Sequence, residues 1–125
     1  MKNETQTVDE IDFDKLGGLA PAIVQDAENG DVLMLGFVNP ESLAITMKTG
    51  FVTFYSRTRQ KLWMKGETSG NRLEVLSSST DCDVDTLLFR VRVQGDGLVC
   101  HEGTRSCFTK ELPVAARSSA AEANG

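Results

Sequence analysis

The sequence DCDVDTLLFRVRVQGDGLVCHEGTRSC, residues 81–107, decides how the chain is organised. Its centre, residues 86–94, alternates apolar and polar side chains, which is typical of a half-buried strand. One face carries Leu87, Phe89, Val91 and Val93, the other carries Arg90, Arg92 and Gln94, and Leu88 is the exception. Three aspartates come directly before this strand, and two cysteines and the only histidine follow it. We therefore expect a rigid strand that supports one metal site or two.

All three cysteines of the chain lie in this stretch: Cys82, Cys100 and Cys107. Their odd number, and an N-terminal segment without the apolar core of a signal peptide, favour thiols or thiolate ligands over disulfides. Three thiolates suit Zn²⁺, which takes four protein ligands in structural sites and three plus a water in catalytic ones. The spacing leaves open a three-cysteine site, a closed site that adds His101, and three buried free thiols. His101 directly follows Cys100, which favours a role in proton transfer over binding of the same ion.

Asp81, Asp83 and Asp85 occupy alternate positions, so in an extended segment their carboxylates project to one face. Carboxylates this close repel one another unless a cation neutralises them, and oxygen ligands suit Mg²⁺ or Ca²⁺. An EF-hand is excluded, because its sixth and twelfth positions would be Thr86 and Arg92. The alternative is a solvated acidic turn. An extended segment would also direct Cys82 to the opposite face, so that the two sites would lie back to back.

Outside this stretch, apolar and β-branched runs predict strands at residues 19–24, 32–38, 51–56 and 73–77, with a shorter apolar segment at 61–64. One helix is expected at residues 40–49, with Asn39 as its N-cap, Gly50 after its end, and Leu43 and Met47 facing inward. This order predicts an α+β fold with a mainly antiparallel sheet and one or two short helices. We expect one domain at residues 13–112, a mobile acidic segment at 1–12 and a disordered tail at 113–125.

The net charge of −5 argues against nonspecific binding to nucleic acid or to an anionic membrane surface. Residues 57–72, however, contain five basic residues and one acid, a local charge of +4 that leaves −9 for the rest of the chain. Arginine forks, hydroxyls and glycines in this stretch suit phosphate, although a solvated charged hairpin has the same composition. Trp63 suits stacking on a base or a partly exposed position in the core. The longest apolar run is too short to span a bilayer, and a cytoplasmic location is expected.

Three blocks, SRTRQKLWMKGETSGN (residues 56–71), DCDVDTLLFRV (81–91) and CHEGTRSCF (100–108), resemble the signature blocks of the phosphoribosyl-AMP cyclohydrolase family. The resemblance extends from about Leu19 to Phe108. It departs from the family pattern at Glu102, where Thr is usual, and in the loop at residues 95–99. The family hydrolyses the C6–N1 bond of the adenine ring of phosphoribosyl-AMP, the third step of histidine biosynthesis, and this implies a metal-dependent hydrolase that acts on a cyclic amidine.

The resemblance also implies cofactors and partners. Members are intertwined homodimers with one Zn²⁺ and one Mg²⁺ per subunit. Cys82 of one chain would bind zinc together with Cys100 and Cys107 of the other, and Asp81, Asp83 and Asp85 would bind Mg²⁺. A zinc-activated water would attack C6, with His101 as the proton carrier. The candidate substrate contacts are Arg57, Arg59, Lys61, Trp63, Lys65, Glu67, Thr68, Ser69 and Arg105. The competing interpretation is a noncatalytic zinc-clamped dimer that binds a nucleotide or a protein.

Overall fold

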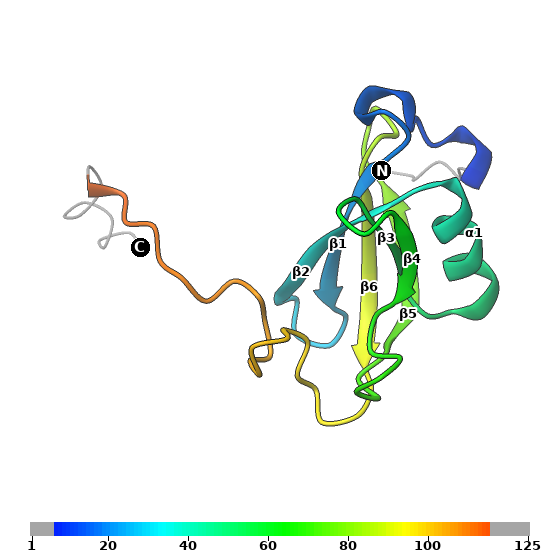
Figure 1. Cartoon of the computed structure of the whole chain (residues 1–125). Coiled ribbons are helices and arrows are strands. Elements are labelled where there is room, and N and C mark those ends of the chain that lie inside the picture. The colour runs from blue at the N-terminus through cyan, green and yellow to red at the C-terminus, as the bar shows by residue number, and fades with distance from the viewer. Residues whose placement is uncertain (1–6, 116–125) are drawn as a thin grey trace.

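The computed structural model describes residues 7–115, which form two sheets and one α-helix (Figure 1). In chain order the elements are the 3₁₀ turns η1 (Val8–Glu10) and η2 (Asp14–Leu16), β1 (Ala20–Asp26), β2 (Val32–Val38), α1 (Pro40–Thr49), β3 (Thr53–Ser56), β4 (Lys61–Met64), β5 (Leu73–Thr80) and β6 (Leu87–Val93). The predicted α+β class with one clear helix is therefore confirmed.

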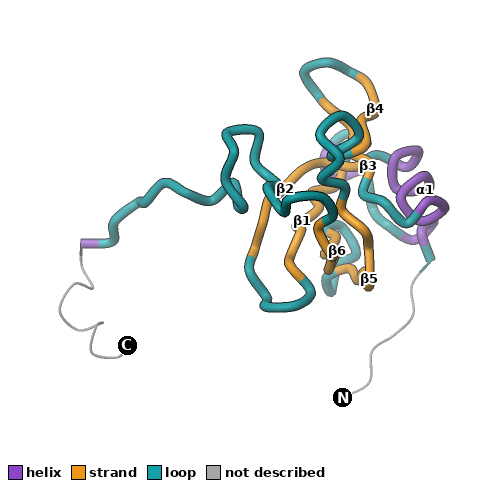
Figure 2. Tube along the Cα trace, turned by 90° about the horizontal axis from the view of Figure 1, so that it is seen from below, coloured by secondary structure: helices purple, strands orange, loops and turns teal. Residues whose placement is uncertain are grey.

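The larger sheet has the strand order β2-β1-β6-β5, and β3 and β4 form a separate antiparallel hairpin. Within the larger sheet, β1 pairs with β6 in parallel, and the other two pairings are antiparallel. The sheet is thus mainly antiparallel, as predicted, with one parallel pair that the sequence did not indicate. Seen along the strands, α1 lies on one side of the strands and the C-terminal segment leaves on the other (Figure 2).

The strand β6 has the burial pattern that its alternating sequence predicts. Leu87, Phe89 and Val91 are buried and Arg90 and Arg92 are exposed. The three buried side chains pack with buried residues of β1, β2 and β3 in one core, which includes Ala20, Ala22, Val24, Leu33 and Phe54. Because it is paired on both edges and buried on one face, β6 is a rigid support for the loops at its two ends.

The strand β5 is longer than predicted. Ser78, Ser79 and Thr80 continue its pairing with β6 to Leu87, although hydroxyl-rich runs are typical of loops. The register shifts between Val75 and Ser77, and the intervening Leu76 is half exposed. As a result, the loop that follows Thr80 begins at the very end of the sheet.

The helix α1 has the predicted caps. The Asn39 side chain accepts a hydrogen bond from the Ser42 N–H (2.8 Å), and Gly50 adopts the left-handed conformation that ends the helix (φ 83°). Leu43 is buried as expected, but Met47 is 41% exposed, so that expectation is wrong. Thr46 is buried instead, because its hydroxyl accepts a hydrogen bond from the Thr53 N–H and donates one to the Ser42 carbonyl.

The N-terminal packing begins before the expected boundary at residue 13. Ile11 lies in the hydrophobic core, and the Asp12 N–H donates to the Val84 carbonyl (2.7 Å), so this segment is held against the β5–β6 connection. Of the segments expected to be mobile (1–12) and disordered (113–125), residues 1–6 and 116–125 lie outside the described part of the chain. Among residues 7–115, no helix has the length and apolarity needed to cross a membrane.

Candidate metal centres at the two ends of β6

The acidic loop, residues 81–86, joins β5 to β6 in a tight turn. Oδ1 of Asp81 accepts hydrogen bonds from the N–H groups of Asp85 (3.0 Å) and Thr86 (3.2 Å), and Val84 adopts a left-handed conformation (φ 59°). The expectation of an extended segment is therefore wrong. The physical reason is that an aspartate side chain readily binds backbone N–H groups a few residues ahead and so closes a turn.

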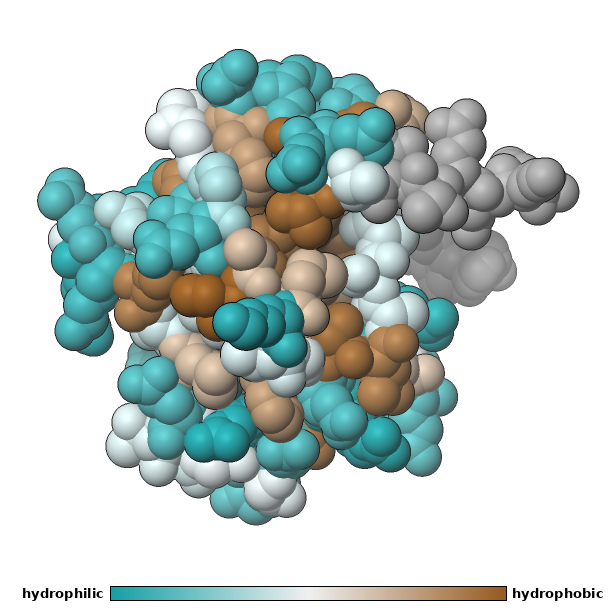
Figure 3. All heavy atoms as spheres, turned by 90° about the vertical axis from the view of Figure 1, so that its right-hand side faces the viewer, coloured by the Kyte–Doolittle hydropathy of each residue, from teal (hydrophilic) through white to brown (hydrophobic). Residues whose placement is uncertain are grey.

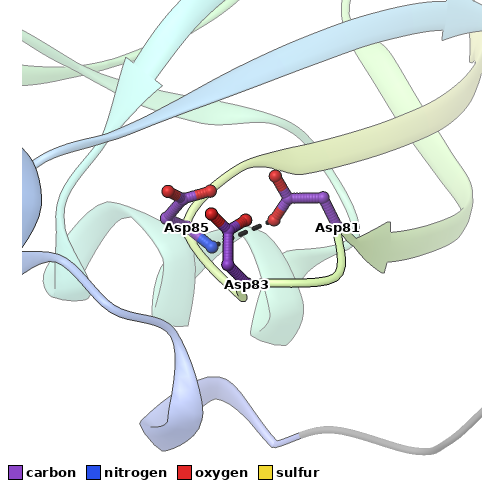
Figure 4. Close-up of side chains that lie close together, drawn as sticks. All are labelled: Asp81, Asp83 and Asp85. Atoms are coloured by element: carbon purple, nitrogen blue, oxygen red, sulfur yellow. Dashed lines mark hydrogen bonds between the residues drawn. The ribbon is translucent and has the colours of Figure 1, made fainter.

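This turn nevertheless brings the three carboxylates together (Figure 4). One oxygen from each of Asp81, Asp83 and Asp85 lies within 4.8 Å of the others. Among residues 7–115, no other group of three or more acidic, cysteine or histidine side chains comes together in this way. Three converging carboxylates offer the oxygen ligands that Mg²⁺ and Ca²⁺ prefer, so the residues fit a hard divalent cation.

A lysine that the sequence interpretation did not single out reaches into the acidic loop. Nζ of Lys15, in η2, lies 3.1 Å from Oδ2 of Asp83 and 3.0 Å from Oδ2 of Asp85. The Lys15 hydrogen bond is the main cause that lowers the pKa of Asp85 to about 2, and the Thr86 hydroxyl adds to this effect. In turn, the two carboxylates raise the pKa of Lys15.

The cysteine loop, residues 100–107, lies beyond the other end of β6. The Cys100 N–H donates to the Thr104 carbonyl (3.0 Å), and the Cys107 N–H donates to the Leu33 carbonyl of β2 (2.8 Å). The two thiols lie close enough for each to shift the pKa of the other. A cavity of about 390 Å³ is lined by Cys100, His101, Glu102, Cys107, Phe108, Thr109 and Lys110.

The environments of the two thiols differ. A hydrogen bond from the Glu102 backbone, assisted by the Thr104 hydroxyl, lowers the pKa of Cys100. Partial burial is the largest cause that raises the pKa of Cys107, and the neighbouring Cys100 thiol adds to the rise, while the nearby Lys65 ammonium opposes it. The Cys100 thiol therefore loses its proton more readily than the Cys107 thiol. Two neighbouring sulfurs fit two ligand positions on a zinc ion.

Cys82 does not join this pair within one chain. It is exposed in the acidic loop, and the seven residues of β6 separate that loop from the segment leading to Cys100 (Figure 1). Seven strand residues span roughly 20 Å. The described chain therefore brings together two of the three predicted zinc ligands and leaves the third at the opposite end of the strand.

The predicted substrate contacts divide into two groups at opposite ends of β4. Arg57 and Arg59 lie in the β3–β4 turn next to Lys61, and the Arg57 guanidinium stacks over the Phe37 ring at 4.3 Å. At the other end, Lys65, Glu67, Thr68 and Ser69 follow β4, and Oε1 of Glu67 accepts from the Met64 N–H (3.2 Å). The ring of Trp63 is partly buried against Phe54, with centroids 5.2 Å apart, and Lys65 lies over it.

Arg105 has protein partners on both sides of its guanidinium. Its Nη1 lies 2.6 Å from Oδ2 of Asp31, and its Nη2 lies 2.6 Å from Oδ2 of Asp26. These two aspartates flank the turn of the β1–β2 hairpin. Burial alone would raise the pKa of Asp26, but hydrogen bonds from the Glu28 N–H and from Arg105 lower it. Ser106 adds a bond from Oγ to the Val32 carbonyl (2.9 Å). Arg105 thus fastens the cysteine loop to the hairpin, and a direct contact with substrate stays a prediction.

Comparison with known proteins identifies the relatives of this chain. Residues 34–109, well over half of the chain, match the family described as phosphoribosyl-AMP cyclohydrolase, PRA-CH. The chain belongs to the phosphoribosyl-AMP cyclohydrolase family. The matched region contains both loops and the basic stretch, so the resemblance carried by the three sequence blocks is confirmed.

Individual relatives agree with this assignment. The chain is 54% identical to "Phosphoribosyl-AMP cyclohydrolase" of Trichlorobacter lovleyi over 99 residues, 79% of this chain and 78% of that protein. It is 54% identical over 102 residues to the protein of the same name from Solibacter usitatus, covering 82% and 80%. It is also 58% identical over 99 residues to "Histidine biosynthesis bifunctional protein HisIE" of Escherichia coli K12, of which it covers 48%.

Sequence reasoning missed Lys15, Asp26 and Asp31. The first lies outside the family match, and the segment around it has no feature that marks it as part of a site. Asp26 and Asp31 flank a turn, where acidic residues are ordinary. Only the tertiary structure reveals that these three side chains contact the two phosphoribosyl-AMP cyclohydrolase loops.

Proposed function

We propose that this chain catalyses the hydrolytic opening of the adenine six-membered ring of 1-(5-phosphoribosyl)-AMP, at the C6–N1 bond, in histidine biosynthesis. The observation that carries the proposal is the family match over residues 34–109, which contains both the acidic loop and the cysteine loop. A cytoplasmic location, where the other biosynthetic steps would take place, belongs to the same proposal.

The chemistry divides between the substrate, the metal and the protein. The N1 substituent makes the purine ring cationic, so C6 is electrophilic. Cys82, Cys100 and Cys107 would hold a zinc ion, which would supply a water activated for attack at neutral pH. The water oxygen would bond to C6 and become the carbonyl oxygen of an amide as the C6–N1 bond breaks. Of the two water protons, one would pass to N1 and the other would be released to solvent, and the exocyclic nitrogen would be retained. His101 is exposed in the cavity beside Cys100, a position that suits transfer of the proton to N1.

The zinc ion would be shared between two subunits, with Cys82 of one joining Cys100 and Cys107 of the other. The separation of Cys82 from the thiol pair along β6 supports this, because a second chain with its acidic loop beside the cysteine loop would supply the missing ligand. One Zn²⁺ per subunit and two equal sites would follow from the symmetry of such a dimer. His101 would then remain outside the zinc shell.

Exposed apolar side chains support a homodimer. Leu35 in β2 is 45% exposed, and Phe108 and Leu112, in the C-terminal segment that extends from the body, are 65% and 89% exposed (Figure 1). The face that bears α1 also has apolar surface among polar side chains (Figure 3). Apolar surface of this kind is typical of a contact with another chain. Exchange of the C-terminal segments between subunits would make the dimer intertwined.

One Mg²⁺ per subunit would bind at Asp81, Asp83 and Asp85, whose converging oxygens support this assignment. The two phosphates of the substrate would contact the basic residues, with Arg57, Arg59 and Lys61 at one end of β4 and Lys65 with the Thr68 and Ser69 hydroxyls at the other. Trp63 and Glu67 lie along this surface, and Arg105 would contribute from the cysteine loop.

The direct test is turnover of phosphoribosyl-AMP, followed by the change in absorbance as the ring opens. Zinc-loaded protein with Mg²⁺ is expected to convert the substrate, and removal of zinc with a chelator is expected to abolish conversion until zinc is restored. AMP, which lacks the N1 substituent, is the control and is expected to remain unchanged. A zinc-containing protein that binds phosphoribosyl-AMP without turnover would favour the noncatalytic zinc-clamped dimer.

A further inference from the structure

The contact between Lys15 and the acidic loop joins two segments far apart in the sequence. The ammonium lies between the carboxylates of Asp83 and Asp85, 3.1 and 3.0 Å from their Oδ2 atoms. The segment that carries Lys15 is held in place by backbone bonds: the Asp12 N–H donates to the Val84 carbonyl, and the Gly18 N–H donates to the Phe13 carbonyl (2.8 Å). The turn η2 therefore holds the backbone of Lys15 beside the acidic loop.

We propose that the Lys15 ammonium is a tethered cation that neutralises the acidic loop when no divalent ion is bound and competes with Mg²⁺ for the same carboxylate oxygens. This proposal rests on the magnesium site of the proposed function. Mg²⁺ requires oxygen ligands at about 2.0–2.1 Å and near-ideal octahedral geometry. The Lys15 ammonium is hydrogen-bonded to two of the three candidate ligands, so it occupies carboxylate lone pairs that Mg²⁺ would need. The positive charges of the ammonium and of Mg²⁺ would also repel each other if both were bound to the same carboxylates.

The exposure of Lys15 suits displacement. Its side chain is 48% exposed, so it can move into water without breaking the core, whereas the Asp85 carboxylate is only 21% exposed and stays in the loop. The lysine stem is flexible, and its ammonium is a compact charge that water solvates well. Binding of Mg²⁺ would therefore release Lys15, and removal of Mg²⁺ would let it return.

Two consequences distinguish a competing cation from a lysine that merely stabilises the fold. Without Lys15 the loop should bind Mg²⁺ more tightly, because no internal cation has to leave. The stabilising effect of Lys15 should also be confined to the Mg²⁺-free protein, because the displaced side chain contributes nothing once the ion is bound. A lysine that positions the carboxylates for the ion would have the opposite effect on affinity.

The experiment titrates Mg²⁺ into zinc-loaded, Mg²⁺-free protein by calorimetry and compares wild type with Lys15→Met, which keeps most of the stem and loses the charge. We expect Mg²⁺ to bind Lys15→Met about 3- to 10-fold more tightly, the range expected for loss of two exposed ion pairs. Lys48→Met, which removes an exposed charge at the end of α1, is the matched control and should leave the affinity unchanged. Thermal unfolding should show Lys15→Met below wild type without Mg²⁺ and equal to it at saturating Mg²⁺.

Other outcomes separate this proposal from the proposed magnesium site. If wild type binds Mg²⁺ and Asp83→Asn does not, but Lys15→Met binds it equally or more weakly, the competition is disproved and the site stands. If wild type and Asp83→Asn both fail to bind Mg²⁺, the site and the competition are both wrong. Should Lys15→Met fold poorly, Lys15→Arg serves instead: it keeps the charge, and an affinity more than about 3-fold above wild type would contradict the competition.

Discussion

The two loops at the ends of β6 differ in how much of a metal site one chain can build. The acidic loop places its three carboxylates within a span of five residues, and one turn brings them together. The cysteine loop supplies only two thiols, and the third cysteine lies at the far end of the strand. Ligands close in sequence can converge through local hydrogen bonds, whereas ligands separated by a rigid strand would meet at one ion only if a second chain supplied the missing one.

Removal of one ligand should affect the two loops unequally. Cys107→Ala leaves the cysteine loop with a single thiol, so we expect loss of zinc and no detectable turnover. Asp83→Asn alters only the acidic loop and should retain zinc while its affinity for Mg²⁺ falls. Zinc and magnesium content, measured after dialysis, would show both effects. Stoichiometric zinc in Cys107→Ala would remove this residue from the site.

His101 should matter for the reaction and not for the metal. His101→Ala is expected to retain zinc and to lose about 10²- to 10⁴-fold in kcat, the usual contribution of a general acid or base. Glu102→Gln, which changes the next residue in the same cavity lining, is the control and should have a much smaller effect. Loss of zinc from His101→Ala would make the histidine a ligand, and full activity would exclude it as the proton carrier.

Arg105 should act on the cysteine loop through its two carboxylate partners. Arg105→Met frees the loop from Asp26 and Asp31, and we expect zinc affinity to fall about 10-fold, as happens when residues that support metal ligands are removed. Arg105→Lys, which can still contact one carboxylate, should retain part of the zinc affinity. Arg90→Met, on the exposed face of β6, is the control and should leave the zinc affinity unchanged. Unchanged zinc affinity with a raised KM would instead indicate the substrate contact that the resemblance implies.

The pH dependence of stability should reflect Asp26. Its pKa is lowered in the folded protein by the Glu28 N–H and by Arg105, so its ionised form stabilises the fold above the ordinary carboxyl pKa, near 4, and this contribution is lost as pH falls through the lowered value. The difference in melting temperature between wild type and Asp26→Asn should therefore shrink from pH 6 to pH 3. A constant difference across this range would contradict the pairing with Arg105.

The sequence predicts the local elements well, because their signals are local. The caps at Asn39 and Gly50 mark both ends of α1, and the alternation in β6 marks its buried face correctly. The parallel pairing of β1 with β6 could not be predicted, since it joins strands 60 or more residues apart. Apolar periodicity predicts an inward Met47, because it does not reveal that the Thr46 hydroxyl has buried hydrogen-bond partners.

The candidate site, too, is predictable from the sequence where its signals are local and not where it depends on tertiary packing. The convergence of the three aspartates was predicted for the wrong reason, because a turn closed by Asp81 brings them together and not an extended strand. The pairing of Cys100 with Cys107 followed from the family resemblance, because the spacing alone left a three-cysteine site, a closed site with His101 and free thiols open. Lys15 and the carboxylate partners of Arg105 escaped prediction, since each contact depends on how distant segments pack.

Subunit complementation tests the central claim most directly, namely that the zinc site needs both ends of β6 from two different chains. Cys82→Ala and Cys107→Ala are purified separately, each expected to be inactive, and then mixed under conditions that let subunits exchange. A mixed dimer joins Cys100 and Cys107 of the first variant with Cys82 of the second, so it has one intact site of two. We predict recovery of zinc binding and turnover on mixing. No recovery, in mixtures where mixed dimers are demonstrated by mass spectrometry, would contradict the shared site.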